Sequence, residues 1–154
     1  MSTRINQSKV YRLFPALPQG LTLIADAVEE TAIDKRLICL LEIRSSQING
    51  CGFCLDMHFR HARELGEDQQ RLDVIAAWRE VPWFSEQESA ALHLCELLTQ
   101  LPSNRVSDED FSRLSQHFSE AEIIALVSTI VKINSWNRVV AAFHFIPQQE
   151  ASKK

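Results

Sequence analysis

The sequence contains few of the residues that interrupt helices. Of its 154 residues, only 4 are glycine and 5 are proline. Apolar residues instead recur at intervals of three and four, the spacing that places side chains on one face of an α-helix. We therefore predict an all-α, single-domain helical bundle. A chain of this length can bury a hydrophobic core that is stable without disulfides or bound metal. A cluster of reactive residues is therefore better explained by chemistry than by a need for stability.

The sequence also lacks a strong excess of charge and any long apolar run. Its formal net charge is −4 and charged residues make up 23% of the chain, a balance that argues against nucleic acid as a partner. No stretch approaches about 18 uninterrupted apolar residues, and residues 1–20 show no signal-peptide pattern. We expect a cytoplasmic protein with no membrane partner.

One domain is expected to span residues 1–154, with an irregular arm at 1–18, a core at about 19–147 and a short polar tail. The apolar spacing indicates helices in the core, and the turns between them should be short. The expected helices cover residues 21–30, 34–47, 51–65, 68–78, 84–102, 107–118 and 119–145.

Local signals mark the ends of several of these helices. Ser85 with Glu88, and Ser119 with Glu122, have the spacing of capping boxes, in which each residue satisfies a free backbone N–H at the helix start. Gly66 follows the helix expected over 51–65 and suits the position where a positive φ closes a helix.

The four cysteines are unevenly spaced, and only Cys51 and Cys54 are close in sequence. They begin the run "CGFCLDMHFRH", which also contains His58 and His61. On a helix with about 100° per residue, these four positions fall within an arc of about 80°. We therefore expect their side chains to meet in one pocket, where redox or metal chemistry is more plausible than a secreted disulfide framework.

The spacing of these residues suits thiol chemistry. Thiols in the first turn of a helix meet free backbone N–H groups and the positive end of the helix dipole, both of which favour the thiolate. His58 lies one turn after Cys54 and is the natural base for its proton. Cys51 and Cys54 can close a disulfide after one sulfur is oxidised to a sulfenic acid. This is the outline of a thiol peroxidase cycle.

Two other interpretations of this motif stay open. Cys51, Cys54, His58 and His61 form a set that could bind zinc, although structural zinc sites usually take their ligand pairs from separate segments. The motif could also be an inert part of a helix, because Cys-x-x-Cys alone is a weak signal. The alternative functions are thus a metal-binding or structural oligomer without turnover, or a general disulfide oxidoreductase.

The run "RSSQINGCGFCLDMHFRHARELGED" closely resembles the core motif of the AhpD-like alkylhydroperoxidases, a family within the carboxymuconolactone decarboxylase superfamily. The segments "WFSEQESAALHLCELLT" and "INSWNRVVAAF" resemble later helices of that family, so the likeness covers most of the chain after Asp34. The resemblance implies an all-helical fold, a peroxide substrate in antioxidant defence and assembly into trimers or hexamers. It also implies an external dithiol reductant, lipoamide-type or thioredoxin-like, and no bound cofactor.

The resemblance assigns roles by position. Cys54 becomes the thiol that attacks peroxide, Cys51 the resolving thiol and proton donor, and His58 the proton-relay imidazole. The family often has a glutamate twelve positions before the first motif cysteine, where this chain has Cys39. Glu42, one turn later, is expected either to substitute for it or to be a solvated helix residue. The decarboxylases of the superfamily lack the paired thiols, so Cys51 and Cys54 argue against that chemistry.

Several other residues attract attention and have simpler explanations. Phe53 stands where the best-studied AhpD pattern has a histidine, which implies a differently arranged proton relay. Cys39 and Cys95 lie among apolar residues and are expected to be small core residues. His61 could line the pocket or be a partly exposed surface histidine. Trp136, Asn137 and Arg138 could cap the site or an interface. The alternative is core packing for the tryptophan and surface placement for the arginine.

Overall fold

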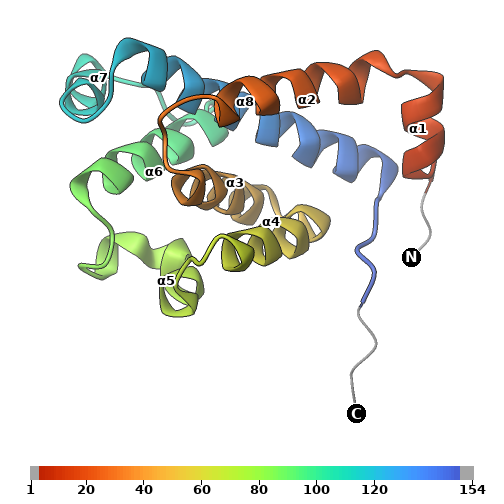
Figure 1. The fold of residues 1–154 in the computed structure, drawn as a ribbon, viewed down its shortest axis with the longest axis horizontal. Coiled ribbons are helices and arrows are strands. Elements are labelled where there is room, and N and C mark those ends of the chain that lie inside the picture. The colour runs from red at the N-terminus through yellow and green to blue at the C-terminus, as the bar shows by residue number, and fades with distance from the viewer. Residues whose placement is uncertain (1–3, 150–154) are drawn as a thin grey trace.

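A computed structural model describes residues 4–149 of the chain (Figure 1). Within that range it contains eight α-helices, one short 3-10 helix and no strand, so the predicted all-α fold is confirmed. The helices are α1 (Gln7–Leu13), α2 (Ala16–Glu29), α3 (Lys35–Asn49), α4 (Gly52–Glu64), α5 (Gln69–Val74), η1 (Ile75–Glu80), α6 (Glu86–Thr99), α7 (Asp108–Ser115) and α8 (Glu120–Phe143).

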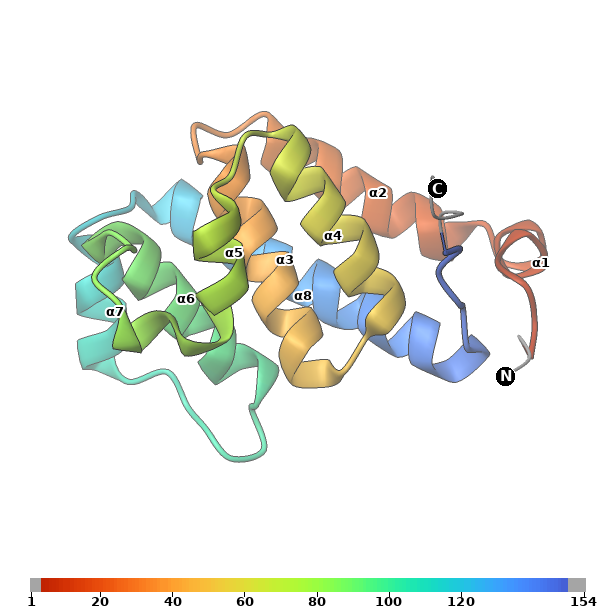
Figure 2. The ribbon, with the colours of Figure 1, turned by 90° about the horizontal axis from the view of Figure 1, so that it is seen from below.

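Helix α3 is at the centre of the bundle. It lies between α4 and α6 in both ribbon views and also packs along α8, which in turn packs along α2 (Figures 1 and 2). Its side chains Leu40, Leu41 and Ile43 are fully buried. Removing this apolar surface from water is the main force that holds the surrounding helices against α3.

The predicted helix ends are confirmed where a local signal marks them. Both capping boxes form, at Ser85 with Glu88 before α6 and at Ser119 with Glu122 before α8. Gly66 follows α4 with a φ of 81°, a conformation that costs glycine little because it has no Cβ. Short-range chemistry alone therefore sets these boundaries.

The prediction of an irregular arm over residues 1–18 is wrong, because most of the described part is helical. The side chain of Asn6 caps α1 by accepting a hydrogen bond from the N–H of Lys9 at 2.8 Å. Pro15 immediately precedes α2, where its missing N–H costs no helical hydrogen bond. The N–H of Arg4 donates to the carbonyl of Phe143, which ties this end of the chain to the end of α8.

The single helix expected over 68–78 is also wrong. The segment divides into α5 and η1, and Ala77 inside η1 is non-helical, with φ −118° and ψ 33°. Ile75 and Trp78 are buried in this bent arrangement. The indole N–H of Trp78 donates to Glu96 Oε1 of α6 at 3.0 Å. A contact with a distant helix therefore overrides the local helical pattern.

Helix α8 is long and apolar enough to cross a membrane by length and composition, yet half of that stretch is buried inside the domain. It packs against α2, α3 and α6 as a core helix, and Lys132 near its middle is buried. Its other side is apolar and exposed, including Ile124 and Val131. The sequence analysis expected no membrane partner because it found no long uninterrupted run of apolar residues. In α8, Lys132 interrupts such a run.

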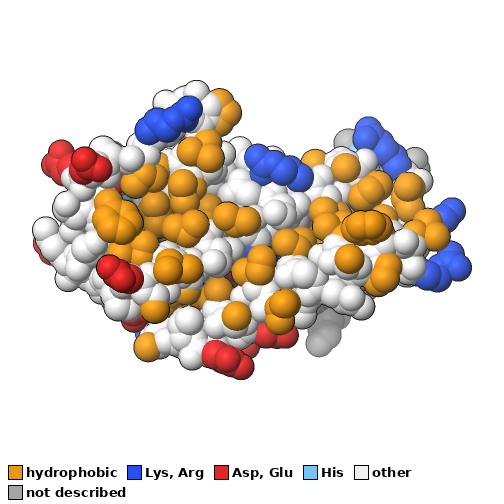
Figure 3. Space-filling model, turned by 90° about the horizontal axis from the view of Figure 1, so that it is seen from above, with side chains coloured by type: hydrophobic (Ala, Val, Ile, Leu, Met, Phe, Trp, Pro, Cys, Tyr) orange, Lys and Arg blue, Asp and Glu red, His pale blue; other side chains and the backbone are white. Residues whose placement is uncertain are grey.

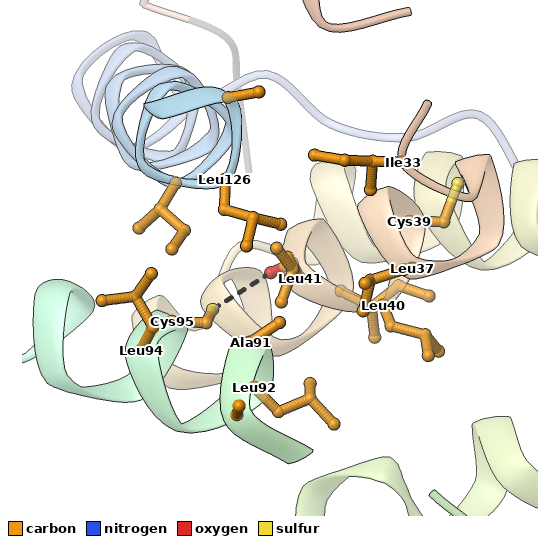
Figure 4. Close-up of a cluster of buried hydrophobic side chains, with 14 of the residues drawn as sticks. Ile33, Leu37, Cys39, Leu40, Leu41, Ala91, Leu92, Leu94, Cys95 and Leu126 are labelled. Carbon is orange, nitrogen blue, oxygen red and sulfur yellow. Dashed lines mark hydrogen bonds between the residues drawn. The ribbon is translucent and has the colours of Figure 1, made fainter. Parts of the chain in front are cut away.

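Cys39 and Cys95 are buried, as expected. Figure 4 shows Cys95 of α6 facing α3, where its thiol donates to the carbonyl of Leu41 at 3.3 Å. Burial raises the pKa of Cys95 to about 11 and that of Cys39 to about 12. Neither thiol is therefore a thiolate near neutral pH, which fits the expected role of both cysteines as core residues.

Candidate active site

Cys51 and Cys54 are joined by a disulfide at the start of α4, with their Cα atoms 5.3 Å apart. Cys51 is the N-cap residue, and its sulfur accepts a hydrogen bond from the N–H of Cys54 at 3.3 Å. The two residues are only 6% and 1% exposed, respectively. The amino end of α4 thus places a backbone N–H against the Cys51 sulfur, and the positive end of the helix dipole at this position favours a thiolate.

The turn before the cysteines is fixed to α8 by asparagine side chains. Gly50 ends α3 with a φ of 67°, which lets the chain reverse direction before Cys51. The amide of Asn49 donates to Asn137 Oδ1 at 2.8 Å, and Asn137 in turn donates to Ser46 Oγ at 3.1 Å. Asn137, one of the three residues that could cap the site or an interface, is buried and anchors the motif.

His58, Glu42 and Lys132 form a buried charged cluster beside the disulfide. Nδ1 of His58 lies 3.0 Å from Glu42 Oε2, and Nζ of Lys132 lies 2.5 Å from Glu42 Oε1. The contact to His58 has the distance of an ion pair, but its angle is not that of an aligned hydrogen bond. The cluster connects α4, α3 and α8, so it forms only when the helices have packed.

Two opposing effects set the charge of Glu42. Burial by itself raises the pKa of this carboxyl group, but the electrostatic attraction of His58 and Lys132 and the hydrogen bond from Lys132 outweigh burial and lower the pKa to about 2. Glu42 is therefore ionised at neutral pH. An ionised carboxylate at Nδ1 of His58 fixes the ring and leaves Nε2 as the nitrogen that can exchange protons with the cavity.

Of the two expectations for Glu42, the solvated helix residue is wrong. Glu42 is 4% exposed and lies against His58. Cys39, at the position of the usual family glutamate, lies instead against His61, with its sulfur 3.5 Å from Nδ1 of that ring. The missing carboxylate at position 39 is therefore matched by a carboxylate one helical turn later.

The expectation that all four motif side chains share one pocket is wrong, because Cys51 does not line the cavity that Cys54 shares with His58, and neither does His61. The side chain of His61 is exposed and lines a cavity of about 200 Å³ together with Cys39 and His58. The angular argument failed for Cys51 because this residue has an extended backbone as the N-cap and lies outside the helix. The buried side of α4 runs through Cys54, His58 and Ala62 instead.

Cys54 and His58 border a second cavity, of about 270 Å³. Its walls are largely aromatic and apolar, and Trp136 packs against Tyr11 with ring centroids 5.9 Å apart. Trp136 is therefore a cavity wall, whereas Arg138 is exposed. Lys132 also lines this cavity, and the sequence reasoning missed it. Its only signal was a single lysine inside the apolar run "STIVKINSW".

The sequence pattern that defines the carboxymuconolactone decarboxylase family matches residues 15–97, more than half of the chain. This chain belongs to the carboxymuconolactone decarboxylase family. It is 41% identical to YdfG of Bacillus subtilis over 128 residues, covering 81% of this chain and 87% of YdfG.

Within this family the chain is AhpD-like. The crystal structure of ATU0492 from Agrobacterium tumefaciens, a protein of unknown function described as a candidate AhpD antioxidant defence protein, has a TM-score of 0.88. The two are 33% identical, and the match covers 97% of this chain and all of ATU0492. The debrominase Bmp8 also has a similar structure, with a TM-score of 0.74 over 87% of this chain and 72% of Bmp8. At 21% identity, that likeness shows the fold alone.

The zinc interpretation of the motif lacks suitable geometry in this family member. Over residues 4–149, no group of three or more His, Cys, Asp and Glu side chains is arranged to hold a metal ion. His61 and the cysteines border different cavities, and the two cysteine sulfurs are bonded to each other.

Proposed function

We propose that this protein is a thiol-dependent peroxidase of the alkyl hydroperoxide reductase type that serves antioxidant defence. One observation carries the proposal: Cys54 borders the same cavity as His58, and a buried, ionised Glu42 holds that imidazole. A thiol beside an oriented base, at the amino end of a helix, is the arrangement that generates a reactive thiolate.

In the first step His58 takes the proton of Cys54, and the thiolate attacks the outer oxygen of the hydroperoxide. The O–O bond breaks, Cys54 is oxidised to a sulfenic acid, and the alkoxide leaves as an alcohol after receiving a proton. His58 can supply that proton because it has just accepted one. The cavity has room for a small organic hydroperoxide beside both residues.

In the second step the Cys51 thiol attacks the Cys54 sulfenic acid. A disulfide forms and water leaves, which gives the Cys51–Cys54 bond seen in the structure. An external dithiol then reduces this bond and is itself oxidised to a disulfide. The cycle needs no bound cofactor, because the electrons pass from dithiol to peroxide through the two sulfurs.

Glu42 and Lys132 act in this scheme as positioning residues. Lys132 balances the buried charge of Glu42, and Glu42 holds Nδ1 of His58. Glu42 does not have to exchange a proton during turnover, because its pKa lies far below neutral pH. The carboxylate also stabilises the imidazolium that forms when His58 accepts the thiol proton.

The test is peroxide consumption by purified protein with dithiothreitol or dihydrolipoamide as the reductant. Turnover in the wild type and its absence in Cys54→Ser are expected. A reduced wild-type protein that consumes no hydroperoxide, organic or inorganic, would contradict the proposal. Metal analysis under reducing conditions tests the alternative, because near-stoichiometric zinc that is lost in Cys51→Ser would favour a metal-binding protein.

A further inference from the structure

The two cysteines of the disulfide, Cys51 and Cys54, line different spaces in the molecule. Cys54 lines the aromatic cavity of about 270 Å³ that also contains His58, and Cys51 is not among the lining residues. Cys51 lines an open groove of about 500 Å³ between the start of α4 and the end of α8, which Cys54 does not reach. The disulfide therefore forms part of the wall between two separate spaces.

Three apolar side chains complete that wall. Phe53, Val140 and Phe145 line both the groove and the cavity. The rings of Phe53 and Phe145 meet edge to face with centroids 6.1 Å apart, and Phe145 is buried. Phe53 is also the residue that replaces the histidine of the best-studied AhpD pattern, so in this chain the position helps to close the wall.

The groove on the Cys51 side suits an anionic sulfur nucleophile. None of the described residues that line it is acidic, and its polar members are Asn49, Asn137 and His144. The amino end of α4 opens beside it, because Cys51 and Gly52 are both lining residues. Free backbone N–H groups and the absence of carboxylates lower the cost of bringing a thiolate close to the disulfide.

We propose that oxidant and reductant reach this disulfide from opposite sides, with the reducing dithiol binding in the Cys51 groove. This rests on the proposed function for the assignment of Cys54 to peroxide. A thiolate of the reductant attacks Cys51, the Cys51–Cys54 bond breaks, and Cys54 leaves as a thiolate into the cavity that contains His58. The second thiol of the reductant then attacks the mixed disulfide and releases Cys51, so the reductant becomes a disulfide and the protein a dithiol.

The groove favours a slim aliphatic dithiol. Cys51 is 6% exposed, so the attacking sulfur must enter the groove to reach it. Ala141, Ile146 and Pro147 provide an apolar lining along which an alkyl stem can lie. Separate access has a functional consequence: the leaving Cys54 thiolate is released on the peroxide side, ready for the next oxidation.

The first test measures the two half-reactions separately. The exposed Ala141 lines the groove and not the cavity, so Ala141→Trp should obstruct the groove. Reduction of the oxidised protein by dithiothreitol should slow by about 10-fold or more, while oxidation of the reduced protein by cumene hydroperoxide keeps its wild-type rate. Ala142→Trp, at the next exposed position and outside both spaces, is the matched control and should leave both rates unchanged.

The second test identifies the sulfur that the reductant attacks. Oxidised protein is mixed briefly with 2-mercaptoethanol, quenched with acid, alkylated and digested for mass spectrometry. The adduct should be on Cys51 with the alkyl group on Cys54. The reverse distribution, or an Ala141→Trp protein that is reduced as fast as the wild type, would overturn the proposal. Neither measurement of reduction contains peroxide, so a protein without peroxidase activity would still give an answer about the groove.

Discussion

Oε2 of Glu42 lies 3.0 Å from Nδ1 of His58, and the two residues belong to different helices, α3 and α4. The contact gives the imidazole a defined orientation beside Cys54. Because Glu42 also contacts Lys132 of α8, packing of three helices sets the position of the proposed base. The chemistry of the cysteine motif therefore depends on residues outside it.

The first prediction concerns this base. His58→Ala should slow oxidation of the reduced protein by hydroperoxide by roughly 10²-fold, the usual contribution of a positioned general base. The rate can be followed by stopped-flow tryptophan fluorescence, because Trp136 lines the same cavity. Raising the pH should restore much of the lost rate, since hydroxide then deprotonates the Cys54 thiol without the imidazole. An oxidation rate in His58→Ala equal to that of the wild type would remove His58 from the mechanism.

The second prediction separates the two thiols. Cys54→Ser should lose the fast oxidation step, because a serine hydroxyl has no accessible anion near neutral pH and cannot form a sulfenic acid. Cys51→Ser should consume one equivalent of peroxide and then stop, with a sulfenic acid on Cys54 that dimedone traps. Mass spectrometry of the adduct checks both outcomes. Trapping on Cys51 in the Cys54→Ser protein at the wild-type rate would show that the roles are reversed.

The third prediction is a pH dependence of folding stability. The pKa of Glu42 is lowered from 4.5 to about 2 in the folded protein. A carboxyl group with a lowered folded pKa stabilises the protein above its unfolded pKa, and this contribution disappears as the pH falls from 4.5 to 2. The loss should be roughly 3 kcal/mol. Urea unfolding at a series of pH values measures it.

The control for that experiment removes both charges of the ion pair. Glu42→Gln alone leaves Lys132 buried without its partner and should cost about 3 to 5 kcal/mol. The double variant Glu42→Gln with Lys132→Met should recover much of this stability and show a weaker dependence on pH below 4.5. An equally steep acid dependence in the double variant would place the responsible carboxyl group elsewhere.

The fourth prediction concerns assembly. Exposed apolar side chains lie along α2 and α8, which pack side by side, and include Leu23 at 71%, Ile124 at 66% and Val131 at 53% exposure. Figure 3 shows hydrophobic side chains gathered over the face of the molecule seen from above. A surface of this kind usually marks a subunit contact. We propose that it joins copies of this chain into the trimer or hexamer that the family resemblance implies.

Light scattering checks the assembly at micromolar concentration. The wild type should have a mass that is a multiple of the 17.6 kDa chain, whereas Leu23→Glu with Ile124→Glu should be smaller. Gln70→Glu, at an exposed polar position of α5, is the control for added charge and should keep the wild-type mass. A wild-type protein that scatters as a monomer would contradict the proposal.

The sequence by itself determined the features that depend on neighbouring residues. The capping boxes at Ser85 and Ser119 and the positive φ of Gly66 follow from hydrogen bonds and steric limits within one turn. The pairing of Cys51 with Cys54 is also local, because two intervening residues at a helix start bring the sulfurs together. The all-α fold follows from apolar spacing repeated along the whole chain.

Only the tertiary structure decided what surrounds those sulfurs. The contacts of Glu42 with His58 and Lys132 join separate helices. Spacing within the sequence therefore could not show whether Glu42 is a relay carboxylate or a solvated helix residue. The same holds for the bend at Ala77, where packing against α6 outweighs helix propensity. It holds most of all for the different spaces that Cys51 and Cys54 line. Neighbours in the sequence border different spaces because α8 and the segment after it close around the start of α4.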